Sequence, residues 1–120
     1  MLKKENRLKS RKAFKATYGN NCSVCDCSIV LSIGREKYDK TMPTRVGFVV
    51  SKKIHKRAVI RNKIKRMMRE VVRLYIKNNM LPDKFQSMIF IAKDSILNLN
   101  YAQINEVISR LINKLANNFI

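Results

Sequence analysis

Residues 58–76 predict a long helix whose two sides have opposite chemistry. At about 100° per residue, apolar side chains gather on one arc of this helix and cationic side chains on the other. Only Ala58, Val72 and Ile76 interrupt the cationic arc. The apolar arc has to be buried, so the helix must cover a core that other parts of the chain build. Its members are Ile60, Ile64, Met67, Met68, Val71, Leu74 and Tyr75.

The cationic arc concentrates charge of one sign to an extent that a solvated helix face does not need. Four of its cations recur every four residues, a spacing at which like charges repel by roughly 0.2–0.5 kcal/mol per pair. Glu70 alone relieves this repulsion, from the flank of the arc. We therefore expect an anionic partner outside the chain, to which arginine gives fork-shaped phosphate contacts. The four cations are Arg61, Lys65, Arg69 and Arg73.

The charge of the whole chain points the same way, because 26 Lys and Arg face only 8 Asp and Glu and give a net charge of +18. Such an excess indicates a polyanionic partner, nucleic acid first and an anionic membrane second. No apolar run reaches the roughly 20 residues that span a bilayer, and the basic start lacks the apolar core of a signal peptide. We therefore expect one cytoplasmic domain, residues 1–120, with no membrane partner.

The rest of the chain has the pattern of an α+β domain. Helices are predicted at 3–18 and 101–116, and strands at 28–33, 45–51 and 86–92. The first two strands are expected to pair antiparallel. The third strand, apolar on both sides, is expected at the centre of the sheet or under a helix. The order is therefore α-β-β-α-β-α, and physical grounds favour a right-handed crossover through the long helix.

Phe14 and Tyr18 lie four residues apart on one face of the first predicted helix. Two interpretations stay open: both rings pack in the core, or both line a groove where bases can stack. Gly47, in the second predicted strand, has no side chain to pack, which indicates close approach of a ligand or of another backbone.

The sequence contains few residues that are suited to catalysis. His55 is the sole histidine and lies among cations, so it is better suited to contact a phosphate or a base than to act as a general base. The acidic residues are scattered, which argues against a stand-alone metal-dependent nuclease. Cys22, Cys25 and Cys27 would need a fourth ligand, such as His55 or a carboxylate, to close a zinc site. We interpret them as small apolar side chains that lead into a strand, and we expect no catalytic or metal-binding residue.

One stretch combines Lys52-Lys53 with the spaced motif Ala58-x-x-Arg61-Asn62-x-x-Lys65-Arg66-x-x-Arg69-Glu70. The strand RVGFVVS precedes the motif, an LKxxxxF entry helix stands near the start, and an IFIAK strand and a closing helix follow. Together these features resemble the bacterial ribonuclease P protein subunit over nearly the whole chain. A basic helix alone would not reproduce the elements on both sides of it.

The resemblance implies a small α-β sandwich like the second domain of ribosomal protein S5, with a left-handed βαβ crossover. It also implies a protein that assists a catalytic RNA, which binds most of the Mg²⁺, in removing the 5′ leader from precursor tRNA; no organic cofactor is implied. By position, the leader would lie in a cleft between the first helix and the sheet, lined by Phe14, Tyr18, Val30 and Ser32. A generic structured-RNA-binding or ribosomal-type protein is the alternative. The residues implied to face ribonuclease P RNA are Lys52, Lys53, Arg57, Arg61, Asn62, Lys65, Arg66 and Arg69.

Overall fold

The computed structural model describes residues 6–8, 11–20, 22–26, 28–37, 43–78, 80–81 and 84–119. The α+β order predicted for the expected elements is confirmed, and one further strand, β1, is added to it. None of the described helices is long and apolar enough to cross a membrane. The helices are α1 (Arg11–Gly19), α2 (Ala58–Lys77), the short 3-10 helix η2 (Asp94–Asn98) and α3 (Tyr101–Phe119). The strands are β1 (Cys22–Cys25), β2 (Ile29–Ile33), β3 (Arg45–Val49) and β4 (Ser87–Ala92).

The strands form one sheet in the order β1-β2-β4-β3. β4 runs antiparallel to β2 and parallel to β3, so it lies between the two strands that were expected to pair with each other. The predicted antiparallel pairing of 28–33 with 45–51 is therefore wrong, whereas the central place of the third predicted strand is confirmed. β4 takes this place because it is apolar on both faces, and almost all of its side chains are buried.

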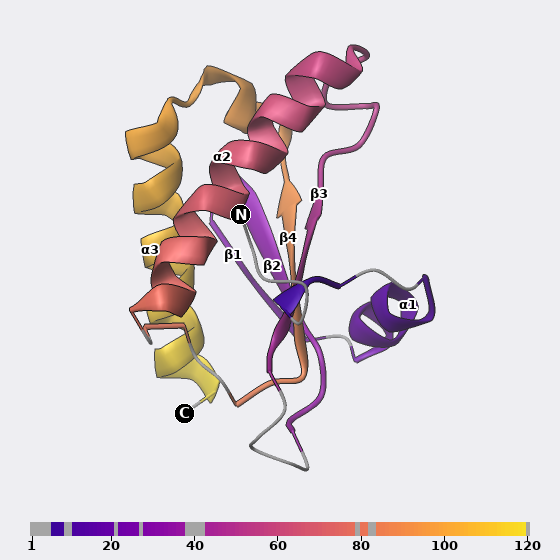
Figure 1. Ribbon diagram of the computed structural model, residues 1–120, viewed down its shortest axis with the longest axis vertical. Coiled ribbons are helices and arrows are strands. Elements are labelled where there is room, and N and C mark those ends of the chain that lie inside the picture. The colour runs from indigo at the N-terminus through magenta and orange to yellow at the C-terminus, as the bar shows by residue number, and fades with distance from the viewer. Residues whose placement is uncertain are drawn as a thin grey trace.

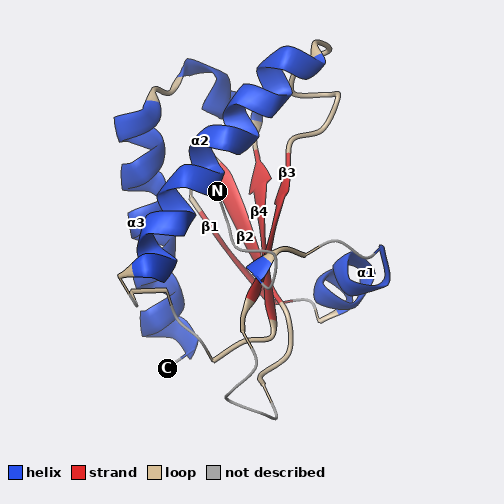
Figure 2. Ribbon diagram, in the orientation of Figure 1, coloured by secondary structure: helices blue, strands red, loops and turns tan. Residues whose placement is uncertain are grey.

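Helices α2 and α3 cover one face of the sheet, and α1 lies on the other face (Figure 1). Figure 2 shows the sheet nearly edge-on, with helices on both of its sides. In the view of Figure 1, β3 and the parallel β4 run upward to the right of α2, and the chain passes from β3 through α2 to β4, which lies to the left of β3. The crossover is therefore left-handed. The right-handed expectation is wrong, and the hand implied by the resemblance is confirmed.

The side chains at the centres of β3 and β4 differ in size between the two faces of the sheet. Phe48 and Phe90 stack with their ring centroids 5.7 Å apart on the face that α2 and α3 cover. Gly47 and Ser87 lie on the opposite face, where the short α1 packs. Because α2 has to bury a long apolar stripe, it lies on the face that offers large apolar partners.

The buried stripe of α2 is rotated relative to the predicted one. Val72, expected to interrupt the cationic arc, is fully buried, whereas Leu74, expected in the core, is 38% exposed. The reason is that α2 packs against α3 as well as against the sheet, so its stripe faces between these two partners. The buried residues of α2 are Ile64, Met68, Val71 and Val72.

Two of the three cysteines belong to β1, a short edge strand that the sequence pattern did not reveal. α3 fastens this edge, because Lys114 Nζ donates to the Cys25 carbonyl at 2.8 Å and Arg110 pairs with Asp26 at 2.7 Å. Cys25 is an exposed free thiol, and Cys27 lies outside the described residues. In the part of the chain that the structure describes, no three His, Cys, Asp or Glu side chains gather as metal ligands would.

The first helix is shorter than predicted and begins at Arg11. Residues 6–8 run beside the edge strand β3 instead. The Leu8 N–H donates to the Val46 carbonyl at 3.0 Å, and the Asn6 amide donates to the Thr44 carbonyl at 3.0 Å. These bonds satisfy backbone groups that the edge of a sheet would otherwise leave open. Residues 3–5, 9 and 10 of the predicted helix lie outside the described residues.

The other two helices end close to their predicted limits. α2 runs to Lys77, while Asn79 and Pro82, two of its expected stop signals, lie outside the described residues. The predicted cap of α3 is confirmed. The Asn100 N–H donates to Gln103 Oε1 at 3.0 Å, and the Gln103 N–H donates to Asn100 Oδ1 at 2.9 Å.

Candidate nucleic-acid interface

A cationic surface covers α2 and the turn before it, and we call it the α2 basic surface. None of its cations forms an ion pair with a carboxylate in the described part of the chain. Among the described residues, no carboxylate therefore balances its charge. The exposed members are Lys52, Lys53, Arg57, Asn62 and Arg66, and the half-buried members are Arg61, Lys65 and Arg69.

The acidic residue on α2 is already engaged with Arg73. Glu70 accepts two hydrogen bonds from the Arg73 guanidinium, at 2.6 and 3.1 Å. The hydrogen bond from Arg73 lowers the pKa of the Glu70 carboxyl, so this carboxyl is ionised at neutral pH. Arg73 was expected on the cationic arc, but this pairing removes it from the charge that a phosphate would meet.

Arg69 is held in place by an aromatic ring of β3. Its guanidinium carbon lies 5.9 Å from the centroid of the Phe48 ring, which in turn stacks on Phe90. A cation over an aromatic face is attracted by the ring's negative face, by about 0.5–1 kcal/mol at a partly exposed site. The half-buried Arg69 is therefore directed along the β3 side of α2, with its orientation set by the core.

The turn before α2 is organised by His55. The Arg57 N–H donates to His55 Nδ1 at 3.1 Å, and Arg61 Nη1 lies 3.4 Å from the His55 carbonyl oxygen that it donates to. Because Nδ1 accepts a hydrogen bond, this network assigns the ring proton to Nε2. Arg61 was expected to point outward with the other cations, but it turns back toward this carbonyl.

The start of α2 adds partial positive charge to the same surface. Arg57 occupies the N-cap position without a side-chain hydrogen bond to the helix. The backbone N–H groups of Ala58, Val59 and Ile60 have no acceptor among the described residues. Free N–H groups at the start of a helix, together with its dipole, attract anions. The start of α2 thus reinforces the cations around it.

Replacing His55 by alanine is expected to loosen the turn, because the Arg57 N–H loses its acceptor. We expect a loss of about 0.5 kcal/mol in the free energy of unfolding, at the low end for a hydrogen bond because this one is exposed. RNA affinity should fall about two- to fivefold as Arg57 and Arg61 become less well oriented. Thermal unfolding and fluorescence anisotropy with structured RNA measure the two effects.

His55→Asn is the matched control, because an Asn side chain in a turn can accept a hydrogen bond from the backbone two residues on. It should restore most of the affinity that His55→Ala loses. If His55→Asn binds as weakly as His55→Ala, the imidazole does not act through the turn.

The four residues predicted to contact the leader lie on the α1 side of the sheet. Phe14 is half-buried over Gly47 of β3, and Tyr18 is 41% exposed one turn further along the same flank of α1. On β2, Val30 is half-buried and Ser32 is buried, both on the sheet face that α1 covers. Partial burial raises the pKa of the Tyr18 phenol, which therefore stays a neutral hydroxyl at physiological pH.

Sequence reasoning missed an apolar row that continues this surface across the sheet. Val30 of β2 pairs with Ile91 of β4, and Ile91 pairs with Val49 of β3, so the three side chains share the face of α1. All three are half-buried, and Cys25 extends the row onto β1. The alternation of each strand indicated which residues share a face. Only the strand order, however, shows that these residues are neighbours.

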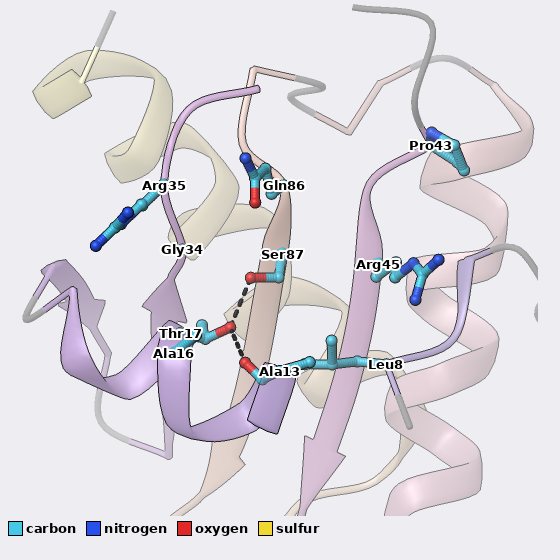
Figure 3. Close-up of a pocket in the computed structure, with 10 residues that line it drawn as sticks. All are labelled: Leu8, Ala13, Ala16, Thr17, Gly34, Arg35, Pro43, Arg45, Gln86 and Ser87. Carbon is cyan, nitrogen blue, oxygen red and sulfur yellow. Dashed lines mark hydrogen bonds between the residues drawn. The ribbon is translucent and has the colours of Figure 1, made fainter. Parts of the chain in front are cut away.

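A pocket of about 420 Å³ lies on the other flank of α1 (Figure 3). None of the four predicted leader-contact residues lines it. It was not expected from the sequence, because its residues come from five separate segments with no common pattern. Its lining residues are Leu8, Ala13, Ala16, Thr17, Gly34, Arg35, Pro43, Arg45, Gln86 and Ser87.

The family model and two related sequences that match this chain belong to ribonuclease P. The family model for ribonuclease P matches residues 2–116 of the chain. The ribonuclease P protein component of Symbiobacterium thermophilum is 33% identical over 115 residues, which cover 94% of this chain and 93% of that protein. The corresponding protein of Clostridium botulinum is 32% identical over 111 residues, 92% of this chain and 95% of that protein.

Solved structures agree with the sequence comparisons. The RNase P protein of Staphylococcus aureus is 28% identical and superposes with a TM-score of 0.74 over 98% of this chain and 100% of that one. A mutant of the S. aureus protein with defective mRNA degradation activity gives a TM-score of 0.79 at 27% identity, over 92% of this chain and 88% of that one. The RNase P protein of Thermotoga maritima shares the fold, with a TM-score of 0.73 at 24% identity over 90% of this chain and 96% of that one.

Proposed function

Because the chain belongs to the ribonuclease P protein family, we propose that it helps a catalytic RNA to remove the 5′ leader from precursor tRNA. In this proposal the RNA cuts the phosphodiester bond. The protein binds phosphates of ribonuclease P RNA through the α2 basic surface. It contacts the single-stranded leader through Phe14, Tyr18, Val30 and Ser32.

The unmatched charge of the α2 basic surface is the observation that carries this proposal. The described acids are engaged elsewhere or scattered, and the one acid of α2 pairs with Arg73. Arg66 is exposed to any partner that approaches α2, and the guanidinium of Arg69 is oriented by Phe48 before RNA arrives. A surface oriented in advance loses little side-chain entropy on binding.

The flank of α1 supports the second half of the proposal. Phe14 and Tyr18 present two rings beside an apolar row of β2, β4 and β3. Stacking of a base on an aromatic ring is worth about 1–3 kcal/mol and tolerates any base. Leaders differ in sequence from one precursor tRNA to the next, so stacking suits them better than contacts to particular base edges.

We further propose that Mg²⁺ acts together with the RNA and that the protein works in the cytoplasm. The described residues bring together no group of three potential metal ligands, and the surrounding cations disfavour a divalent cation on the protein itself. In the holoenzyme, the protein's part is to neutralise phosphates where the catalytic RNA and the precursor meet. Neutralised phosphates let the two RNAs approach, and Mg²⁺ is then held between them where they meet.

Binding to ribonuclease P RNA is expected to depend steeply on salt. If six to eight phosphates are contacted, the logarithm of the association constant should fall with the logarithm of salt concentration at a slope of roughly −4 to −7. Filter binding or anisotropy between about 50 and 200 mM salt measures this slope. A slope near −1 would mean that the α2 basic surface meets about one phosphate, which contradicts the proposal.

Reconstitution tests the function itself. The purified chain, added to ribonuclease P RNA at near-physiological salt, should restore leader removal from precursor tRNA with Mg²⁺ present. A generic structured-RNA binder used at the same concentration should not. Leader removal by the protein alone, surviving pretreatment with micrococcal nuclease, would place the chemistry in the protein and overturn the proposal.

A further inference from the structure

The pocket beside α1 combines an apolar middle with a cationic group at each end. Its size of about 420 Å³ falls in the range of about 300–1,000 Å³ typical of ligand sites. Figure 3 shows Arg35 at the β2 end and Arg45 at the β3 end, with Ala13, Thr17 and Ser87 between them. An extended polyanion could therefore contact a guanidinium at each end while its uncharged part covers the middle.

The charge of these two arginines is not balanced by the described residues. Both side chains are exposed, and neither forms an ion pair with a described carboxylate. Glu36, next to Arg35 in the chain, pairs with Lys84 at 3.3 Å. The pocket therefore favours an anionic ligand.

The floor of the pocket offers a hydrogen-bond acceptor. The Thr17 hydroxyl donates its proton to the Ala13 carbonyl at 2.8 Å, so at 2.6 Å from Ser87 it must accept the proton of the Ser87 hydroxyl. The Ser87 oxygen keeps its lone pairs and has no proton left to give. It suits a ligand that brings a donor, such as the 2′-hydroxyl of a ribose.

The pocket lies on the opposite flank of α1 from the predicted leader contacts. Thr17 faces the sheet, where it meets Ser87. At about 100° per residue, Ala13 and Ala16 fall on one side of Thr17, and Phe14 and Tyr18 fall on the other. The helix thus separates two surfaces with different chemistry, an aromatic one and a cationic pocket.

We propose that this pocket is a second subsite for single-stranded RNA, with phosphates at Arg35 and Arg45 and a ribose hydroxyl at Ser87. The inference rests on the proposed function, because it assumes that RNA strands reach α1. It adds a contact on the flank away from Phe14 and Tyr18. It also assigns a preference for ribose over deoxyribose to this flank.

Two variants of the full-length chain test the subsite with a fluorescent RNA 12-mer and a DNA strand of the same sequence. Ala16→Leu fills the pocket from the exposed flank of α1 without changing charge, and Arg35→Ala removes one cationic end. Each should weaken RNA binding about three- to tenfold. The wild-type chain should bind the RNA strand more tightly than the DNA strand, because only RNA offers a 2′-hydroxyl to Ser87, and Ala16→Leu should reduce this preference. Arg35→Ala should also make the salt slope shallower by about 0.7, as expected for one lost contact to a single strand.

Lys77→Ala is the matched control, because it removes an exposed cation at the far end of α2. It should change RNA binding less than twofold. The subsite is refuted if Ala16→Leu leaves RNA binding within twofold of wild type, if Arg35→Ala does no more than Lys77→Ala, or if Ala16→Leu leaves the preference for RNA over DNA unchanged. A wild-type chain that fails to restore leader removal would instead refute the proposed function, whatever the variants do.

Discussion

Replacing Gly47 by valine is expected to displace Phe14, or α1 with it, from the sheet and to lower the free energy of unfolding by about 1–3 kcal/mol. A Cβ atom built on Gly47 would lie 2.6 Å from Cζ and 2.8 Å from Cε1 of Phe14, and 3.4 Å from Cβ of Leu8. The first two distances are too short for carbon atoms in contact. Phe14 would have to leave its site, or α1 would have to move away from β3.

Urea unfolding measures the loss of stability, and binding of a single-stranded leader RNA should weaken with it, because Phe14 is one of the two rings in the proposed leader site. Phe14→Ala in the Gly47→Val background should recover part of the stability, since it makes room for the new side chain. That coupling separates a clash with Phe14 from a general effect on β3. If Gly47→Val is as stable as the wild type, α1 does not pack on β3 as closely as the structure shows.

Gly19→Ala is the control for the loss of a glycine as such. A Cβ at Gly19 meets nothing within 4 Å, and the backbone there is not in the left-handed region. The substitution should leave stability unchanged or raise it by about 0.4–1 kcal/mol, by restricting the unfolded chain. Loss of a glycine is thus expected to destabilise the chain at Gly47, where a side chain meets Phe14, and not at Gly19, where it meets nothing.

The parts of the fold that the sequence predicted correctly depend on local pattern. The apolar and cationic arcs of α2, the Asn100–Gln103 cap and the two-sided apolar strand β4 each follow from neighbouring residues. The strand order depends on pairings such as Val30 with Ile91, which join residues far apart in the chain. The hand of the crossover is a property of the whole β3-α2-β4 unit, and a general preference for right-handed crossovers predicted it wrongly.

In the candidate site too, the sequence predicted what depends on local pattern and did not predict the tertiary contacts. The members of the α2 basic surface could be named from a spaced motif, but their roles inside the molecule could not. Arg61 turns toward the His55 carbonyl, Arg69 lies over Phe48, and Arg73 is paired with Glu70. Each of these contacts depends on tertiary packing or on the choice between nearby partners. The α1 pocket was not foreseen at all, because Ala16, Arg35 and Ser87 come together only when α1 crosses the sheet.

Reversing the charge of Arg66 is expected to weaken binding to ribonuclease P RNA roughly 10- to 100-fold, the range for losing a charge-assisted hydrogen bond worth about 1.5–3 kcal/mol. Arg66 is exposed, carries no ion pair in the described part of the chain and stands at the centre of the outward face of α2. Arg66→Glu removes a fork-shaped phosphate contact and adds a charge that repels the same phosphate. The fold should survive, because an exposed substitution of this kind usually changes stability by less than about 0.5 kcal/mol.

Lys77→Glu is the control that distinguishes the loss of a specific phosphate contact from an effect of net charge. It makes the same change of net charge on the same helix, but outside the α2 basic surface. If the surface binds phosphates in a defined arrangement, Lys77→Glu should cost only a few-fold in affinity, while Arg66→Glu also makes the salt slope shallower by about 1. If both variants weaken binding equally, net charge alone attracts the RNA and the position of Arg66 on the α2 basic surface has no part in it. Anisotropy titrations at several salt concentrations separate the two cases, because long-range attraction falls with screening for both variants alike, whereas a lost contact persists.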